Sequence, residues 1–278
     1  MKQSDRLDIL IARLSSEPGM YRGYDGGRTR REKRDALRAM MNVRLPRPID
    51  EGTLRIQDEY LVDCVIEKGI VTLSKIPTLG GGPMGDVLSV WQGDITRLRV
   101  GAIVNAANAR MLGCFQPLHN CIDNCIHTYA GMELRLECAR QMAEKRRLYG
   151  EGYEQPTAEP MLTPGYNLPA EHIIHVVGPI VDDEVTAEQD RELTACYTNT
   201  LALCAENGIR SVAFCCISTG VFRFPKDRAA GIAVRTVRQW LTEHPGQMER
   251  VIFAVHNDGD RRRYERACAD PAGKEAFG

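Results

Sequence analysis

Hydrophobic residues in the first third of the chain recur at helical spacing. After the candidate N-cap Ser4, four apolar residues follow the i, i+3, i+4, i+7 pattern of an amphipathic helix: Leu7, Leu10, Ile11 and Leu14. The segments 29–44 and 53–68 predict two further helices, and the first of them starts with a basic run. We therefore expect a helical extension over residues 1–80, which ends in a glycine-rich break over 78–86.

From residue 87 onward, short β-rich apolar runs alternate with longer helical segments. The runs that predict strands are 87–91, 102–106, 173–177, 212–217 and 251–255. Further helices are predicted at 186–207, 226–243 and 260–268. From Ile122 to Cys138, apolar residues at steps of four predict one continuous helix. Such alternation predicts a second domain over 81–278, with an α/β/α layered sheet and ligands at the carboxyl ends of its strands.

Composition and charge narrow the class of protein. The 278 residues are 43% hydrophobic and 26% charged with a net charge of -1, which is typical of a globular protein and argues against a general nucleic-acid binder. The charged N-terminus does not resemble a secretory signal, and no apolar run approaches membrane-spanning length. Most of the ten cysteines lie in apolar runs, so we expect reduced thiols in a cytoplasmic protein with no membrane contact.

Two segments contain candidate binding chemistry. Asp94 follows the first predicted strand, and the strand at 102–106 runs into the sequence Asn-Ala-Ala-Asn at 105–108, so polar side chains are expected near the sheet edge. The segment 216–225, CISTGVFRFP, leads from a buried strand toward a helix that has Pro225 in its first turn. Successive N–H groups there can bind a pyrophosphate. Taken singly, neither segment establishes a binding site, and for 216–225 an ordinary strand-to-helix turn is slightly favoured.

In combination, four motifs resemble the macrodomain family of ADP-ribose-binding α/β/α modules with a mixed central sheet. In chain order they are GDIT, NAAN with a following LG, LTPGYNLPAEHIIHVVGP and ISTGVFRFP. The resemblance implies that Asp94 holds the adenine amino group, that Ile95 lines the same pocket and that Asn108 contacts the distal ribose. It also implies that one loop wraps the diphosphate, with Phe222 packing near that ribose. The residues of that loop are Ser218, Thr219, Gly220, Val221 and Phe222.

The segment between NAAN and the following helix contains a cluster of potential metal ligands. Cys114, His119 and Cys121 offer two thiolates and one imidazole, a set that Zn²⁺ prefers. Judged from residue types alone, the cluster is equally compatible with core thiols. Hydrolytic macrodomains have a run of glycines here, and its replacement resembles a zinc-containing microbial macrodomain subgroup. The resemblance implies a Zn²⁺ cofactor with three protein ligands, which leaves one coordination position open.

The residues after this cluster match the hydrolytic branch of the same family. Asp123, Ile126 and His127 follow the family pattern of a helix that begins with an aspartate and continues to Ile-His. We expect His127 to pack on the helix and face Asp123, and Cys125 to be buried, so neither is predicted to bind the metal. Asp123 is expected to position or deprotonate the attacking water.

These features predict an enzyme that removes mono-ADP-ribose from protein side chains, with Asp123 and Asn108 as catalytic residues and an ester to Asp or Glu as the expected linkage. The subgroup is associated with lipoyl-carrier proteins modified by a sirtuin-type transferase, which suggests the substrate. Three alternatives are a non-catalytic ADP-ribose reader, an O-acetyl-ADP-ribose deacetylase and a phosphate-binding regulatory protein with a structural zinc. For the basic run of the extension, a solvated helix face is favoured over a partner surface.

Overall fold

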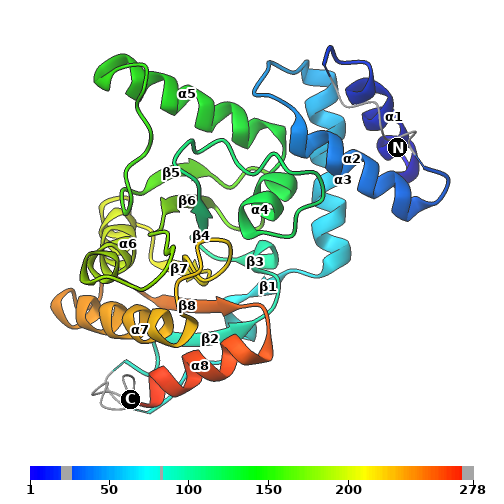
Figure 1. Ribbon diagram of the computed structural model, residues 1–278. Coiled ribbons are helices and arrows are strands. Elements are labelled where there is room, and N and C mark those ends of the chain that lie inside the picture. The colour runs from blue at the N-terminus through cyan, green and yellow to red at the C-terminus, as the bar shows by residue number, and fades with distance from the viewer. Residues whose placement is uncertain (20–26, 82–83, 271–278) are drawn as a thin grey trace.

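Six strands form a mixed sheet in the computed structural model, which describes residues 1–19, 27–81 and 84–270 (Figure 1). All neighbouring strands are parallel except β5, which is antiparallel to β6 at one edge. In spatial order the strands are β2 (Leu88–Gln92), β8 (Arg250–Val255), β7 (Ser211–Phe214), β4 (Ala102–Ala107), β6 (His172–Val177) and β5 (Met161–Pro164). The five strands predicted from sequence are therefore all present.

Helices cover both faces of this sheet. The chain moves from β6 through β7 to β8 in one direction and from β4 to β6 in the other, so right-handed crossovers between these parallel strands place two sets of helices on opposite faces. The first set is α6 (Ala187–Glu206), α7 (Lys226–Glu243) and α8 (Asp258–Ala269), which pack side by side; the second is α4 (Ile122–Ala130) and α5 (Met132–Tyr149). The expected three-layer α/β/α fold is confirmed.

The central strands are largely apolar because helices cover both of their faces, and Asn105 of β4 and His175 of β6 are buried polar exceptions. In β4 and β6, Val104 pairs with Ile174 in register, and both side chains are fully buried. Phe214 of β7 pairs with Phe253 of β8 and continues the same core. Within the described residues, no helix is long and apolar enough to cross a membrane.

Three expectations about the elements were wrong in detail. The continuous helix predicted from Ile122 to Cys138 is broken at Gly131, whose φ of +102° lies in a region that favours glycine. The first helix begins at Gln3 with Lys2 as its N-cap, so Ser4 lies inside it. Pro225 is the N-cap of α7 and precedes its first turn.

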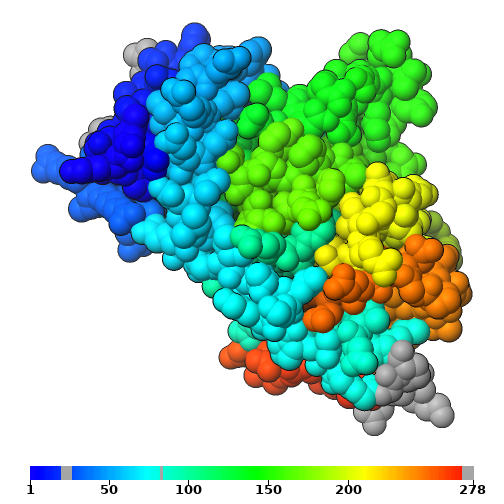
Figure 2. All heavy atoms as spheres, turned by 180° about the vertical axis from the view of Figure 1, so that it is seen from behind, coloured from blue at the N-terminus to red at the C-terminus, as the bar shows by residue number. Residues whose placement is uncertain are grey.

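Three helices of the N-terminal segment form a lobe beside the sheet: α1 (Gln3–Ser15), α2 (Arg30–Val43) and α3 (Glu51–Lys68). Figure 2 shows these blue and cyan helices at one side of the molecule, away from the red C-terminal helix. The lobe has its own apolar cluster, which Met132 of α5 joins. After the 3-10 helix η1 (Leu73–Lys75) comes the break predicted over 78–86, of which residues 82 and 83 lie outside the described residues, as do 271–278 of the predicted second domain.

The predicted extension also contains a strand. Val71 and Thr72 form β1 (Val71–Thr72), which pairs in parallel with β3 (Leu98–Arg99). Along the chain, β3 follows β2 of the main sheet. A two-residue strand has no alternating pattern to recognise, so hydrophobic periodicity cannot detect it. This pairing fastens the end of the N-terminal lobe to the sheet domain.

Arg135 of α5 connects the lobe to the sheet domain by filling backbone acceptors on both. Its Nη1 donates to the carbonyl oxygens of Met41 and Arg44 at 3.0 and 2.5 Å, and its Nε donates to that of Leu112 at 2.8 Å. The guanidinium also lies over the Phe115 ring, 4.3 Å from its centroid. Burial lowers the pKa of Arg135 to about 10, so the side chain stays charged at neutral pH.

We expect Arg135→Met to lower the free energy of unfolding by about 3 kcal/mol, because three carbonyl groups lose their donor inside the protein. Urea denaturation measures the loss. Arg140→Met is the matched control: Arg140 lies on the same helix but pairs only with Glu137 and Glu144 at the surface, so stability should hardly change. Equal stability of the two variants would contradict the connecting role of Arg135.

Candidate functional site

Loops that follow four parallel strands lie together at the carboxyl ends of these strands. Asp94 follows β2, Asn108 follows β4, Gly178 follows β6 and Ser218 lies beyond β7. A Cβ added at Gly178 would lie only 2.1 Å from the Ser218 Oγ, so the loops after β6 and β7 touch each other across the end of β4. Doubly wound sheets bind their ligands at the carboxyl ends of the strands.

The buried carboxylate of Asp123 lies near these carboxyl ends of the strands. Asp123 is in the first turn of α4, and its two oxygens accept hydrogen bonds from the side-chain amides of Asn105 at 2.8 Å and Asn108 at 3.3 Å. Burial raises the pKa of Asp123 to about 6, although the two amides and the charge of Arg135 act to lower it. The structure thus brings together the two residues predicted to be catalytic, Asp123 and Asn108.

A second row of hydrogen bonds orients Asn105. Its side-chain amide lies 3.0 Å from Nδ1 of His175, the residue opposite it in register on β6, and Nε2 of His175 lies 3.1 Å from the Thr163 hydroxyl. Burial lowers the pKa of His175 to about 3, so the imidazole is neutral. An amide nitrogen can only donate, so Nδ1 accepts and Nε2 carries the proton toward Thr163. Hydrogen bonds therefore connect Thr163, His175, Asn105 and Asp123 in one network.

His127 faces Asp123, as expected. Its Nε2 lies 3.6 Å from the Asp123 carboxylate, and burial lowers the pKa of His127 well below its ordinary value, so the ring is neutral. His127, Cys138 and His175 also form a fully buried group with donor atoms within 4.8 Å of one another. Both ring nitrogens of His175 already have partners in the network, so we assign this group to hydrogen bonding within the core.

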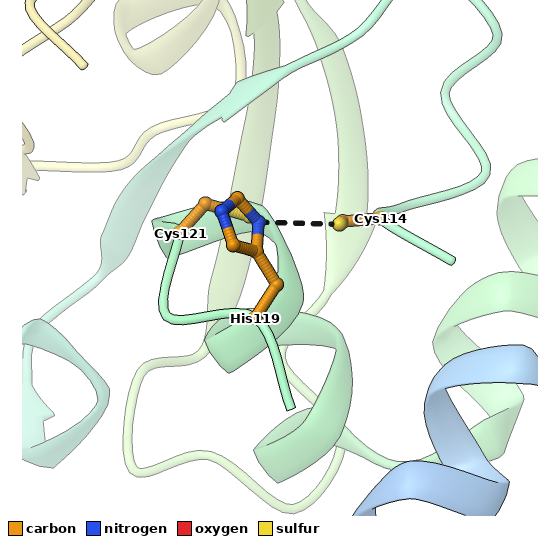
Figure 3. A group of neighbouring side chains, drawn as sticks. All are labelled: Cys114, His119 and Cys121. Atoms are coloured by element: carbon orange, nitrogen blue, oxygen red, sulfur yellow. Dashed lines mark hydrogen bonds between the residues drawn. The ribbon is translucent and has the colours of Figure 1, made fainter. Parts of the chain in front are cut away.

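The three predicted metal ligands come together at the start of α4. Donor atoms of Cys114, His119 and Cys121 lie within 4.8 Å of one another, and all three residues are half-buried. Figure 3 shows the His119 ring directed at the Cys114 sulfur, with 3.5 Å between Nδ1 and Sγ. Cys125 is half-buried and lies outside this group, its sulfur 3.8 Å from Nη2 of Arg38.

The chemistry of this group fits a soft dication. Two sulfurs and one imidazole are the donor set of many Zn²⁺ sites. Burial raises the pKa of the Cys121 thiol to about 12; the helix N–H of Asn124 lowers it, and the neighbouring Cys114 raises it further. A cation between the two sulfurs would offset both burial and mutual repulsion, because the thiolate is the form that binds metal.

Side chains from α2 hold the loop that contains the three ligands. Asn42 accepts a hydrogen bond from the Leu118 backbone at 3.0 Å and donates to the Thr128 hydroxyl at 3.0 Å. Nη2 of Arg38 donates to the His119 carbonyl oxygen at 2.7 Å and to the Asn124 side chain at 3.0 Å. The N-terminal lobe therefore fixes the shape of this loop.

The loop after β7 presents free backbone donors. Within the described residues, the N–H groups of Ser218, Gly220, Val221 and Phe222 have no acceptor, whereas that of Phe224 donates to the Ser218 carbonyl. Ser218 has a φ of +63°, and its buried hydroxyl has no partner among the described residues. Several N–H groups without an acceptor on one short turn beside the start of α7 are available to an anion. The role of this turn as a diphosphate loop stays a prediction; the Thr219 hydroxyl closes the turn by donating to the Cys216 carbonyl.

Asp94 is already engaged by neighbours. It caps the 3-10 helix η2 (Ile95–Arg97), in which Ile95 is buried, by accepting from the Thr96 N–H at 3.0 Å, and its other oxygen accepts from Lys68 Nζ at 2.8 Å. Burial acts to raise the pKa of Asp94, but hydrogen bonds from Lys68 and Thr96 lower it overall. Lys68 Nζ also lies 3.1 Å from the centroid of the Tyr129 ring.

Sequence patterns missed several residues of the site. Lys68 and Arg38 come from helices that the sequence assigns to a separate extension, and nothing in their spacing indicates contact with Asp94 or with the ligand loop. His175 lies inside an apolar strand run, where a histidine signals burial and no more. The sequence does give a signal for Asn105, because this residue is the first of the NAAN motif.

Known proteins resemble this chain in sequence and in fold. A family model described as "Macro domain" matches residues 104–233. A protein-ADP-ribose hydrolase of Treponema medium is 44% identical over 96% of this chain and 99% of its own length, and one of Staphylococcus aureus strain MSSA476 is 43% identical over 84% of each. The crystal structure of a Trypanosoma brucei macrodomain in complex with ADP-ribose has a TM-score of 0.63 and 28% identity, and covers 84% of this chain and 95% of that one.

We expect Gly220→Glu to weaken ADP-ribose binding at least about tenfold, because a carboxylate would occupy the space in front of the free N–H groups and repel a diphosphate. A Cβ at Gly220 meets nothing within 4 Å, so the fold should tolerate the change. Calorimetric titration with ADP-ribose measures the effect, with Gly220→Ala as the matched control. Undiminished affinity of the glutamate variant would show that this loop does not hold the diphosphate.

Proposed function

Because the chain belongs to the macrodomain family, we propose that it is a Zn²⁺-dependent hydrolase that releases ADP-ribose from modified protein side chains. Relatives that match it over most of its length are protein-ADP-ribose hydrolases, and hydrolysis of this class is the activity of the chain. One observation supports the site assignment above all others. The buried carboxylate of Asp123 lies in the first turn of α4, and Cys121, one of the three candidate metal ligands, is the N-cap of that helix, so a base lies beside a soft metal-ligand set.

Asp123 is the proposed general base. The amides of Asn105 and Asn108 hold its carboxylate in place, so one oxygen lone pair can be directed at a water molecule without rearrangement. For an ester to Asp or Glu, the water oxygen bonds to the ribose carbon, the bond from that carbon to the ester oxygen breaks with its electron pair leaving on the side-chain carboxylate, and one water proton goes to Asp123. The products are free ADP-ribose and the side-chain carboxylate.

The chain binds the remote half of the substrate through groups that do not react. The free N–H groups from Ser218 to Phe222 would hold the diphosphate, and Asp94 and Ile95 would line the adenine pocket. Binding energy gained there helps to hold the distal ribose beside Asn108 and Asp123. Val221 is exposed, and its neighbour Phe222 is half-buried, so Phe222 is the proposed packing partner of that ribose.

Cys114, His119 and Cys121 would hold the Zn²⁺. When bound, the ion supplies positive charge that polarises an oxygen atom or lowers the pKa of a bound water to about 7. Three protein ligands match the ligand count of catalytic zinc sites. A lipoyl-carrier protein modified by a sirtuin-type transferase remains the proposed substrate protein.

We expect Cys121→Ser to remove most of the bound zinc and most of the turnover while the fold persists. Cys121 is the N-cap of α4, where its sulfur accepts the Asn124 N–H at 3.4 Å, and serine is also a good N-cap but a poor zinc ligand. Metal analysis of protein purified without added zinc checks the first effect directly. Cys125→Ser is the matched control and should keep its metal. A zinc-free Cys121→Ser enzyme with full turnover would refute the role of the ion.

We expect Asp123→Asn to lower the rate of ADP-ribose release about a hundredfold while ADP-ribose affinity is kept, because the amide cannot accept a proton. Release from an Asp/Glu-modified protein measures the first quantity, and calorimetry measures the second. Asp86→Asn, at an exposed position, is the control. Wild-type protein that binds ADP-ribose but releases none would instead support a reader module.

A further inference from the structure

A groove of about 530 Å³ lies between α2, α3 and α4, outside the residues assigned to catalysis. Its lining contains five cationic and two anionic side chains, in a chain whose net charge is only -1. The cationic ones are Arg30, Arg31, Arg34, Arg38 and Lys68. Positive charge is therefore concentrated at this place.

Internal partners leave much of this charge uncompensated. Arg30 and Arg34 share one carboxylate, that of Glu67. Within the described residues, Arg31 has no carboxylate partner, and Arg38 is bonded only to neutral acceptors. The Nε atoms of Arg34 and Arg38 are buried and lack an acceptor among those same residues. Arg30 and Arg31 are exposed, so their guanidinium groups are accessible to an external anion.

The shape and lining of the groove favour a peptide over a nucleic acid. Arg30, Arg34 and Arg38 are spaced at i, i+4, i+8 and form a stripe only roughly 12 Å long, too short for a nucleic-acid backbone track. Leu37, Met41 and Leu61 also line the groove but are buried in the core of the lobe, so the exposed part of the lining is mainly cationic and suits an acidic peptide.

The groove adjoins the proposed active site. Arg38 lines it and donates to the carbonyl oxygen of His119, one of the three metal-ligand candidates, at 2.7 Å. Lys68 lines it and donates to Asp94 at 2.8 Å. Because Arg38 joins the groove to the candidate metal group, a protein attached to a ribose at that group would have its surface beside the groove.

From these observations we infer that the groove between α2, α3 and α4 docks an acidic segment of the ADP-ribosylated protein substrate. The inference rests on the proposed hydrolase function and adds the class of protein that the enzyme selects. Docking would lower KM for acidic substrates by attraction across the groove, and it would leave the chemical step unchanged because none of Arg30, Arg31 and Arg34 touches the catalytic groups.

The test compares two synthetic peptides, each with one ADP-ribose on a glutamate, in which the flanking residues are acidic in one and their neutral amides in the other. The wild type should show a KM about tenfold lower for the acidic peptide, and the variant R31E/R34Q should lose this difference at unchanged kcat and unchanged ADP-ribose affinity. Arg262→Glu, an exposed charge reversal on α8, is the matched control and should keep the preference. Equal KM values in the wild type, or a preference retained by R31E/R34Q, would overturn the proposal.

A binding measurement separates this proposal from the hydrolase assignment. Fluorescence anisotropy of the unmodified acidic peptide should show binding to the wild type and to Arg262→Glu, and loss of binding to R31E/R34Q and to the single variant Arg31→Glu. If neither modified peptide is hydrolysed while this pattern holds, the hydrolase assignment fails and the groove stands. If a single-stranded oligonucleotide displaces the peptide at lower concentration than the peptide itself, the groove belongs to nucleic acid and the proposal is overturned.

Discussion

The site depends on one constraint, which is that the carboxylate of Asp123 is buried away from water. A buried carboxylate without partners would take up a proton or destabilise the fold. Asp123 avoids this because two amides donate to its oxygens and the Arg135 charge favours its ionised form. Asn105 is in turn oriented by His175, its register partner on β6, and His175 by Thr163 on the antiparallel edge strand. The direction of the Asp123 carboxylate, the proposed base, thus depends on the correct pairing of three strands.

The N-terminal lobe is part of this arrangement and not an appendage. Its helix α2 holds the ligand loop through Arg38 and Asn42, and the last residue of α3, Lys68, neutralises Asp94 at the other end of the site. Arg135 closes the connection from the sheet domain by filling the carbonyl groups at the end of α2. A glycine run could turn tightly without such support, whereas a longer loop with three candidate metal ligands has to be shaped by contacts from outside.

Local patterns were enough to predict most elements and the residue types of the site, because buried strands and amphipathic helices carry their own periodicity. Predictions from the sequence failed where a single residue, or a contact between distant parts of the chain, determines the structure. The steps of four from Ile122 to Cys138 continue through Gly131, so apolar spacing alone predicts one helix where the backbone forms two. The short edge strand β5 ends in Pro164 and has too few residues to show alternation. Lys68 and Asp94 are brought together only by the packing of the lobe, which no single sequence pattern encodes.

Cys121 shows how metal binding and folding are linked in this site. Its sulfur is at once the N-cap of α4 and a member of the candidate metal group. The partial positive charge at a helix N-terminus favours a thiolate, while burial opposes it, and burial has the larger effect because the pKa of the Cys121 thiol is raised to about 12. A bound dication would reverse this balance and leave the N-cap as a thiolate, which accepts the Asn124 N–H more strongly. The same event would stiffen the first turn of α4, where Asp123 lies, so the ion would position the base as well as act on the substrate.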